Sequence, residues 1–220
     1  MTVDIAPPDV AVPPANCYRC PRLAAYRADN RAAEPHWHNA PVPSFGPEDA
    51  RLLIVGLAPG LRGANCTGRP FTGDFAGDLL YRTLGKFGFA SGRYGKRRDD
   101  GVRLQDCRIT NAVRCVPPKN KPETSEFDAC RPFLQAEFAA LLRLKVLLAL
   151  GKGAHDQILK TLGVRPLNRY PFAHGALHDL PDGRVLADSY HCSRYNTNTG
   201  VLTVEMFEAV FAEVRRVVAA

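Results

Sequence analysis

Four short, largely apolar segments constrain the fold of this 220-residue chain more than any other feature. Each ends in, or is directly followed by, glycine or polar residues, which is typical of buried parallel strands. They cover residues 51–56, 107–111, 145–150 and 184–189. Apolar residues at helical spacing predict helices over 78–87, from a cap at Thr124 or Ser125 to Leu142, over 151–162 and over 202–218. This alternation predicts an α/β protein, a three-layer α/β/α sandwich with a central, mostly parallel four-stranded sheet.

A single domain is expected over residues 1–220, beginning with a proline-rich segment at 1–50. Half of the 18 prolines fall within the first 47 residues, so this segment should lie over the surface of a core that begins later. Residues 1–14 lack the basic-then-apolar order of a secretory signal, and no apolar run approaches the roughly 20 residues that span a bilayer. We therefore expect a cytoplasmic protein without a membrane partner. Its 29 basic and 22 acidic residues are compatible with an acidic partner such as nucleic acid, and identify none.

The seven cysteines are odd in number and no export signal accompanies them, which argues against a disulfide framework. Cys17 and Cys20 form a CxxC pair, while Cys115 and Cys130 are separated by fourteen residues. Together they can supply four thiolates to a tetrahedral zinc ion or to an iron–sulfur cluster, and the open second pair favours a cluster. The alternative is that Cys115 and Cys130 are ordinary buried thiols. We interpret the other three cysteines as non-ligands: Cys66, Cys107 and Cys192.

Three unusual segments follow predicted strands: residues 56–77, 111–122 and 190–200. Because working loops leave the carboxyl ends of parallel strands, we expect one shared site there. The first segment is rich in glycine, which lets backbone amides approach a ligand, but it has neither the P-loop nor the dinucleotide-binding pattern. The third begins with His191, whose neighbours suit phosphate contact. The other five histidines are expected to be structural donors: His36, His38, His155, His174 and His178.

Four motifs and the cysteine set together resemble the uracil-DNA glycosylase superfamily, and in particular its family 5, the type b enzymes. The motifs are GLAPG at 56–60, GRPFTGD at 68–74, TNAVRC at 110–115 and HCSRYNTNTG at 191–200. The resemblance implies a DNA glycosylase that flips uracil out of the duplex, hydrolyses its N-glycosidic bond and leaves an abasic site for base excision repair. It further implies a tolerant pocket that accepts other deaminated bases such as hypoxanthine, and a monomer acting on nucleoid DNA. It also implies a structural 4Fe-4S cluster, held by Cys17, Cys20, Cys115 and Cys130.

The resemblance assigns roles to individual residues. Phe71 corresponds to the stacking residue, Asn111 to the amide that reads the pairing edge, and His191 to the donor that stabilises charge on uracil O2. We expect Arg194 to probe the duplex at the gap left by the flipped base. The remaining substrate contacts are assigned to Gly56, Ala58, Ser193 and Asn196.

Two positions depart from the pattern of better-known relatives. Leu57 stands where family 4 enzymes carry an acid, and Cys192 stands where many relatives carry proline. Since leucine cannot activate water, we assign the water-activating or cation-stabilising role to Asp74, as proposed for family 5. The alternative is that Asp74 only caps the helix that begins near Gly77.

Basic residues crowd the loop after the first predicted helix, where they either contact DNA phosphates or form a solvated surface. They are Arg93, Lys96, Arg97 and Arg98. Two other functions stay open at this point. One is a non-catalytic nucleic-acid-binding module with a structural four-cysteine metal site, and the other is a cytoplasmic zinc-binding hydrolase of small nucleosides.

Overall fold

The computed structural model describes residues 12–220, and most of the segment searched for an export signal lies outside these described residues. Its centre is a sheet with the strand order β4-β1-β5-β7-β6. The parallel strands are β1 (Leu52–Gly56), β4 (Cys107–Asn111), β5 (Val146–Leu150) and β7 (Val185–Ser189). The α/β fold is confirmed, and each of these four strands matches its predicted segment to within one residue.

The sheet has a fifth strand that the sequence pattern did not predict. β6 (Leu177–Asp179) pairs antiparallel with β7 at the edge of the sheet. It is only three residues long, and the side chains of Leu177 and Asp179 are exposed. A strand that buries so little apolar surface leaves no hydrophobic run by which it could be recognised.

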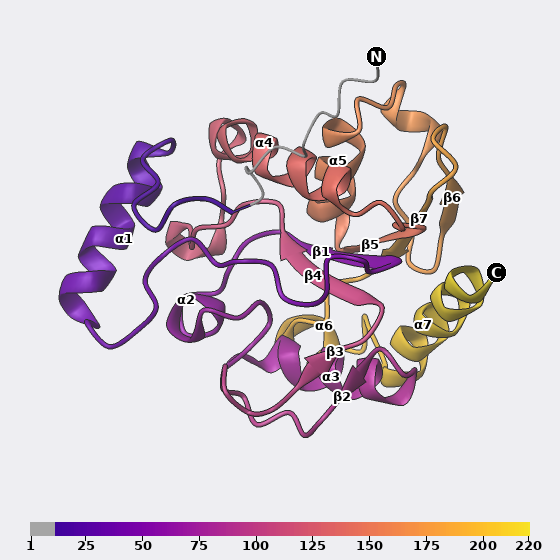
Figure 1. Cartoon of the computed structure of the whole chain (residues 1–220), viewed down its shortest axis with the longest axis horizontal. Coiled ribbons are helices and arrows are strands. Elements are labelled where there is room, and N and C mark those ends of the chain that lie inside the picture. The colour runs from indigo at the N-terminus through magenta and orange to yellow at the C-terminus, as the bar shows by residue number, and fades with distance from the viewer. Residues whose placement is uncertain (1–11) are drawn as a thin grey trace, which may run out of the picture.

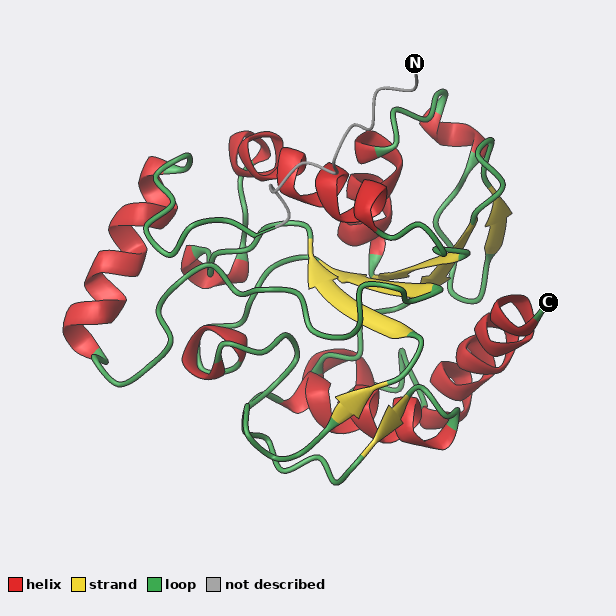
Figure 2. Cartoon of the chain, in the orientation of Figure 1, coloured by secondary structure: helices red, strands yellow, loops and turns green. Residues whose placement is uncertain are grey.

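Helices cover both faces of the sheet and make the three predicted layers (Figures 1 and 2). α4 (Thr124–Ala140) and α5 (Lys152–Thr161) lie on one face, and α3 (Phe75–Lys86) and α7 (Val204–Ala219) lie on the other. Each face has its own apolar core, because alternate strand residues point to opposite sides. Of the helices that the structure describes, none combines the length and apolar character that crossing a bilayer requires.

α4 begins at Thr124, one or two residues before the predicted start, and its cap is not the predicted hydroxyl. The N-cap is Glu123, whose backbone N–H donates to the Glu126 carboxylate at 2.8 Å in a capping box. Arg22 on α1 (Pro21–Ala33) donates to both oxygens of the same carboxylate at 2.8 Å. The cap therefore also ties α1 to the rest of the molecule, a long-range contact that no local pattern reveals.

Shorter elements lie within the connecting loops. The antiparallel strands β2 (Ala90–Ser91) and β3 (Arg103–Leu104) enclose the basic loop, and α2 (Ala64–Thr67) lies within the glycine-rich segment. α6 (Arg194–Asn198) follows β7, and two 3-10 turns cover Pro118–Asn120 and Leu167–Arg169. β1 and β4 meet at their carboxyl ends, where Gly56 of β1 lies opposite Asn111 of β4.

A buried ion cluster joins the loop between α1 and β1 to β4 and α4. Glu137 accepts from Arg108 at 2.5 Å, from Arg114 at 2.6 Å and from the Ser44 hydroxyl at 2.6 Å. Burial by itself raises the pKa of Glu137, but the two guanidinium groups outweigh it and hold the pKa below its usual value. Buried charges of this kind are tolerated only when they are paired, so the cluster fixes residues 44, 108 and 114 together.

Candidate active site

Three predicted site residues come together where the ends of β1 and β4 meet the glycine-rich segment. A methyl group added at Gly56 would lie 2.4 Å from Oδ1 of Asn111 and 2.7 Å from the Phe71 ring. Only glycine fits at position 56, because the amide and the ring both approach its backbone closely. Asn111 and Phe71 are both buried, with 3% and 7% of their surface exposed. The structure thus brings together three predicted site residues, of which Asn111 lies 40 residues or more along the chain from the other two.

Phe71 adopts a left-handed backbone conformation, with φ of +51°. This conformation costs a bulky residue about 1–3 kcal/mol and is found mainly where the surrounding structure imposes it, often at functional sites. The Phe71 ring also lies beside the imidazole of His191, with 5.9 Å between ring centroids and 31° between ring planes. Ring, amide and imidazole therefore converge on one place.

His191 follows β7 and is held by its own loop. The Asn196 side chain donates to the His191 carbonyl at 2.8 Å, and Ser193 caps α6 by accepting from the Asn196 N–H at 3.3 Å. The polar groups of Ser193 and Asn196 thus order the loop. Burial lowers the pKa of His191 below its usual value, which keeps the imidazole neutral near pH 7.

Asp74 both caps a helix and faces the glycine-rich loop. It is the N-cap of α3, and its Oδ1 accepts from the Gly77 N–H at 3.3 Å. A methyl group added at Gly63 would lie 2.4 Å from its Oδ2, so the loop backbone passes close to the carboxylate. Burial raises the pKa of Asp74, although the N–H groups of Gly77 and Ala76 oppose this shift. The capping role is observed, and it leaves one carboxylate oxygen directed at the loop.

Other predicted contacts lie around the pocket or turn away from it. Arg194 is exposed at the start of α6, with its guanidinium 5.4 Å from the Phe75 ring centroid. Ala58 packs against the apolar residues around the cysteines. Leu57 faces the start of α5, where a methyl group added at Gly153 would meet it at 2.6 Å. In the basic loop, Lys96 pairs with Asp78 at 2.7 Å on the surface.

The four predicted metal ligands line one pocket between α1, the segment that follows β4, and α4. Burial raises the pKa of Cys20 to about 11 and that of Cys115 to about 12. Arg27 is 6% exposed and donates to Sγ of Cys115 at 3.5 Å, and among the described residues it pairs with no carboxylate. A buried cation beside four thiols fits a site that becomes anionic when its thiols are deprotonated.

The spacing of these sulfur atoms distinguishes a single ion from a larger group. Within residues 12–220, no three of the four cysteine sulfurs lie within 4.8 Å of one another. A tetrahedral zinc with Zn–S bonds of about 2.3 Å would hold its sulfurs about 3.8 Å apart. The four sulfurs as described are therefore not all spaced as a single tetrahedral zinc ion requires.

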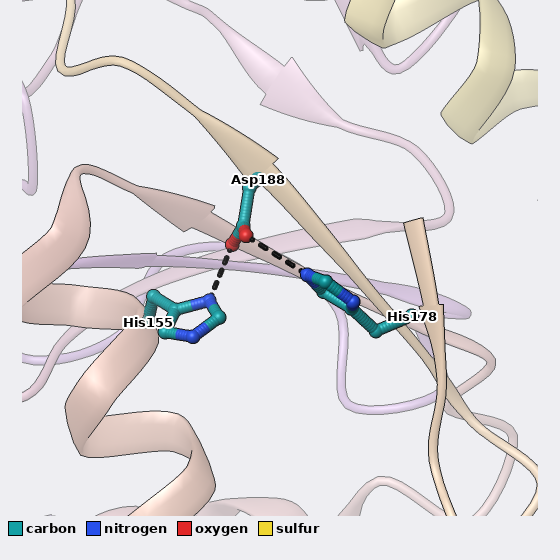
Figure 3. A group of neighbouring side chains, drawn as sticks. All are labelled: His155, His178 and Asp188. Carbon is teal, nitrogen blue, oxygen red and sulfur yellow. Dashed lines mark hydrogen bonds and ion pairs between the residues drawn. The ribbon is translucent and has the colours of Figure 1, made fainter. Parts of the chain in front are cut away.

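A second group of side chains, of types that can ligate a metal, comes from α5, β6 and β7 (Figure 3). Ligand atoms of His155, His178 and Asp188 lie within 4.8 Å of one another. Nδ1 of His155 lies 2.7 Å from Oδ1 of Asp188, and its Nε2 lies 2.9 Å from the Tyr170 carbonyl. Both ring nitrogens of His155 thus face acceptors, while His178 lies 3.3 Å from the other Asp188 oxygen. These bonds join α5, β6 and β7, as expected for structural histidines.

The fold and the groups at its carboxyl edge define the class of α/β proteins that bind a ligand where the strand order reverses, here around β1. Residues 43–215 match the family model of the Uracil DNA glycosylase superfamily. The chain belongs to this superfamily.

Three curated relatives cover almost the whole chain. It is 47% identical over 206 residues to the type-5 uracil-DNA glycosylase of Thermus thermophilus, and the alignment covers 91% of this chain and 93% of the relative. It is 41% identical over 199 residues to that of Pyrobaculum aerophilum, with 89% and 86% covered. It is 38% identical over 208 residues to that of Mycobacterium leprae, with 91% and 90% covered.

Proposed function

We propose that this protein is a type-5 uracil-DNA glycosylase of base excision repair, which hydrolyses the N-glycosidic bond of uracil in DNA and leaves an abasic site. The observation that carries the proposal is the convergence of Phe71, Asn111 and His191 at Gly56, in a chain of this superfamily. All three come from one chain, so a monomer acting on nucleoid DNA suffices. One ring and one amide also accommodate related deaminated bases such as hypoxanthine.

The pocket residues divide the work of base release. A flipped uracil stacks on the Phe71 ring, and the Asn111 amide accepts from its N3–H and donates to its O4. As the glycosidic bond breaks, negative charge develops on the base, and the neutral His191 imidazole donates to O2 and stabilises it. The sugar becomes cationic, and the Asp74 carboxylate stabilises that cation or activates the attacking water. Arg194 occupies the surface beside this site and probes the duplex.

A 4Fe-4S cluster fits the four-cysteine pocket, because the sulfurs are too far apart for one zinc and Arg27 supplies a counter-charge. Cys17, Cys20, Cys115 and Cys130 would hold it. When bound, the cluster supplies iron–thiolate bonds that cross-link α1 to β4 and α4. We assign the cluster a structural role, because it would hold the two loops that also carry the base-recognition residues. The N–H groups of residues 112 and 113 donate to the carbonyls of residues 56 and 57, which joins these loops to each other.

Asp74→Asn tests the chemical assignment. Asparagine caps helices as well as aspartate does, so the fold should persist while the charge is lost. We expect base release, measured as alkali-labile sites in a uracil-containing duplex, to fall about 10²–10⁴-fold, with binding of the duplex retained. Asp78→Asn, which removes a surface carboxylate of the same helix, is the matched control. Unaltered release by Asp74→Asn would refute the role given to this residue.

The two other functions are less well supported. A non-catalytic binding module is not favoured, since the relatives that cover the chain are named as glycosylases. A zinc-dependent hydrolase of small nucleosides would be colourless and would show no preference for DNA. A visible absorption spectrum of the purified protein separates it from the proposed enzyme.

A further inference from the structure

We propose that Tyr94 is a positioning residue for base recognition: its hydroxyl bridges the backbone on both sides of residue 72 and so holds the Phe71 ring in place. This inference rests on the stacking role proposed for Phe71. Tyr94 belongs to the basic loop between β2 and β3, and it does not itself reach the predicted base-reading groups in any contact of the described residues. It acts through the backbone of the segment that carries Phe71.

Two hydrogen bonds make the bridge. The Tyr94 hydroxyl donates to the Phe71 carbonyl at 3.2 Å and accepts from the Gly73 N–H at 3.3 Å. Burial raises the pKa of Tyr94 to about 12, so the hydroxyl keeps its proton and remains a donor. The left-handed Phe71 thus has one side of its turn fixed by a side chain from a distant loop.

Glycine at position 77 makes room for this contact. A methyl group there would lie 2.1 Å from the Phe71 carbonyl oxygen and 2.2 Å from the Tyr94 hydroxyl. Both atoms of the hydrogen bond therefore occupy the space that a Cβ would fill. Gly77 also donates its N–H to Asp74, so the first turn of α3 serves the carboxylate and the bridge together.

The ring of Tyr94 is held by stacking on a second tyrosine ring. It stacks on Tyr81 with 4.5 Å between ring centroids and 16° between planes, and the Tyr81 hydroxyl donates to the Pro70 carbonyl at 2.8 Å. The guanidinium of Arg69 lies 5.0 Å from the Tyr81 ring centroid and 5.8 Å from that of Tyr94. Arg69 in turn makes two 2.7 Å hydrogen bonds with Asp100, which belongs to the same basic loop as Tyr94. The loop therefore cannot shift without disturbing the segment that bears Phe71.

Tyr94→Phe is the decisive variant, because it keeps the stacked ring and removes only the hydroxyl. The single-turnover rate constant for uracil release should fall about tenfold, as expected for one positioning hydrogen bond, while the Kd for an abasic duplex changes less than twofold. Tyr26→Phe on α1 is the control, since the Tyr26 hydroxyl makes no hydrogen bond within the described residues. An unchanged rate in Tyr94→Phe overturns the proposal.

A double-mutant cycle with Phe71→Ala separates positioning from general stability. If Tyr94 acts through the Phe71 ring, its substitution should have no further effect in the Phe71→Ala background. A second tenfold loss there would show that Tyr94 acts by another route and would overturn the inference. Phe71→Ala alone also distinguishes the two levels: full activity of that variant refutes the stacking role itself, whereas loss in Phe71→Ala without loss in Tyr94→Phe refutes only the bridge.

Discussion

Substituting Gly56 by alanine should disable base recognition while leaving the strand intact. Gly56 ends β1 with an ordinary backbone conformation that alanine can adopt, so only side-chain contacts decide the outcome. The new methyl group would stand 2.4 Å from Oδ1 of Asn111 and 2.7 Å and 2.9 Å from two carbons of the Phe71 ring. To regain ordinary contact, the amide must retreat by about 1 Å and the ring by somewhat less.

These displacements set the size of the expected effect. A misplacement of about 1 Å in a catalytic arrangement lowers the rate on the order of 10²-fold. Overpacking of a buried position lowers the free energy of unfolding by about 1–3 kcal/mol, which a folded domain of this size survives. Gly56→Ala should therefore remain folded and lose about 10²-fold in single-turnover uracil release. Its binding to undamaged duplex should hardly change.

Gly85→Ala is the matched control. Gly85 lies on α3, and a methyl group there meets nothing within 4 Å. That change should raise the free energy of unfolding by up to about 1 kcal/mol, because alanine favours helix over glycine, and should leave uracil release unaltered. Release is assayed on a uracil duplex by alkali cleavage, and stability by urea denaturation. A Gly56→Ala enzyme within twofold of the natural rate would refute the pocket as described.

Three further outcomes are expected. Cys17→Ala should lower visible absorbance, the unfolding midpoint and activity together, whereas Cys66→Ala should not; a stable, active Cys17→Ala protein without iron would contradict a structural cluster. Burial lowers the pKa of His191, so as the pH falls below about 6.5 the unfolded protein takes up a proton at this residue before the folded protein does. The stability of the natural protein relative to His191→Gln should therefore be full above about pH 6.5 and shrink as the pH falls. Denaturation at about pH 7.5, 6 and 5 would reveal this change. Glu137→Gln leaves two buried guanidinium groups without a carboxylate and should cost about 3–5 kcal/mol of unfolding free energy, against no measurable change for the exposed Glu213→Gln; equal stability of the two variants would mean that the buried cluster is solvated.

The basic loop shows how one segment can serve two purposes. Arg93, Arg97 and Arg98 are exposed on the outer side of the loop, whereas the side chains of Tyr94 and Asp100 are turned inward. The pairing of Arg97 with Asp99 is on the surface and contributes little to stability. Contact with DNA on the outer side and support of Phe71 on the inner side are therefore compatible.

Local sequence determined the parallel sheet, its helices and the order in which the chemical motifs arrive. The strand Val146–Leu150 is an uninterrupted apolar run and the strand Leu52–Gly56 is apolar up to its final glycine, a pattern that burial on both faces favours. The strands Cys107–Asn111 and Val185–Ser189 also carry polar residues. The motifs at residues 56, 111 and 191 follow strand ends, so their approach to one another was implied by the topology. The three-residue β6, Leu177–Asp179, was missed because it is too short and too polar to show a strand pattern.

Only the tertiary structure decided which side chains meet. Gly56 makes room for Asn111 and Phe71, Ala58 packs beside the cysteines, and Tyr94 fixes Phe71. All of these are contacts between residues distant in the chain. Their residue types are common and carry no local signal. Periodicity reports whether a residue faces the core, since burial follows the backbone repeat, but the partner it meets there depends on how separate elements pack, which no single segment encodes.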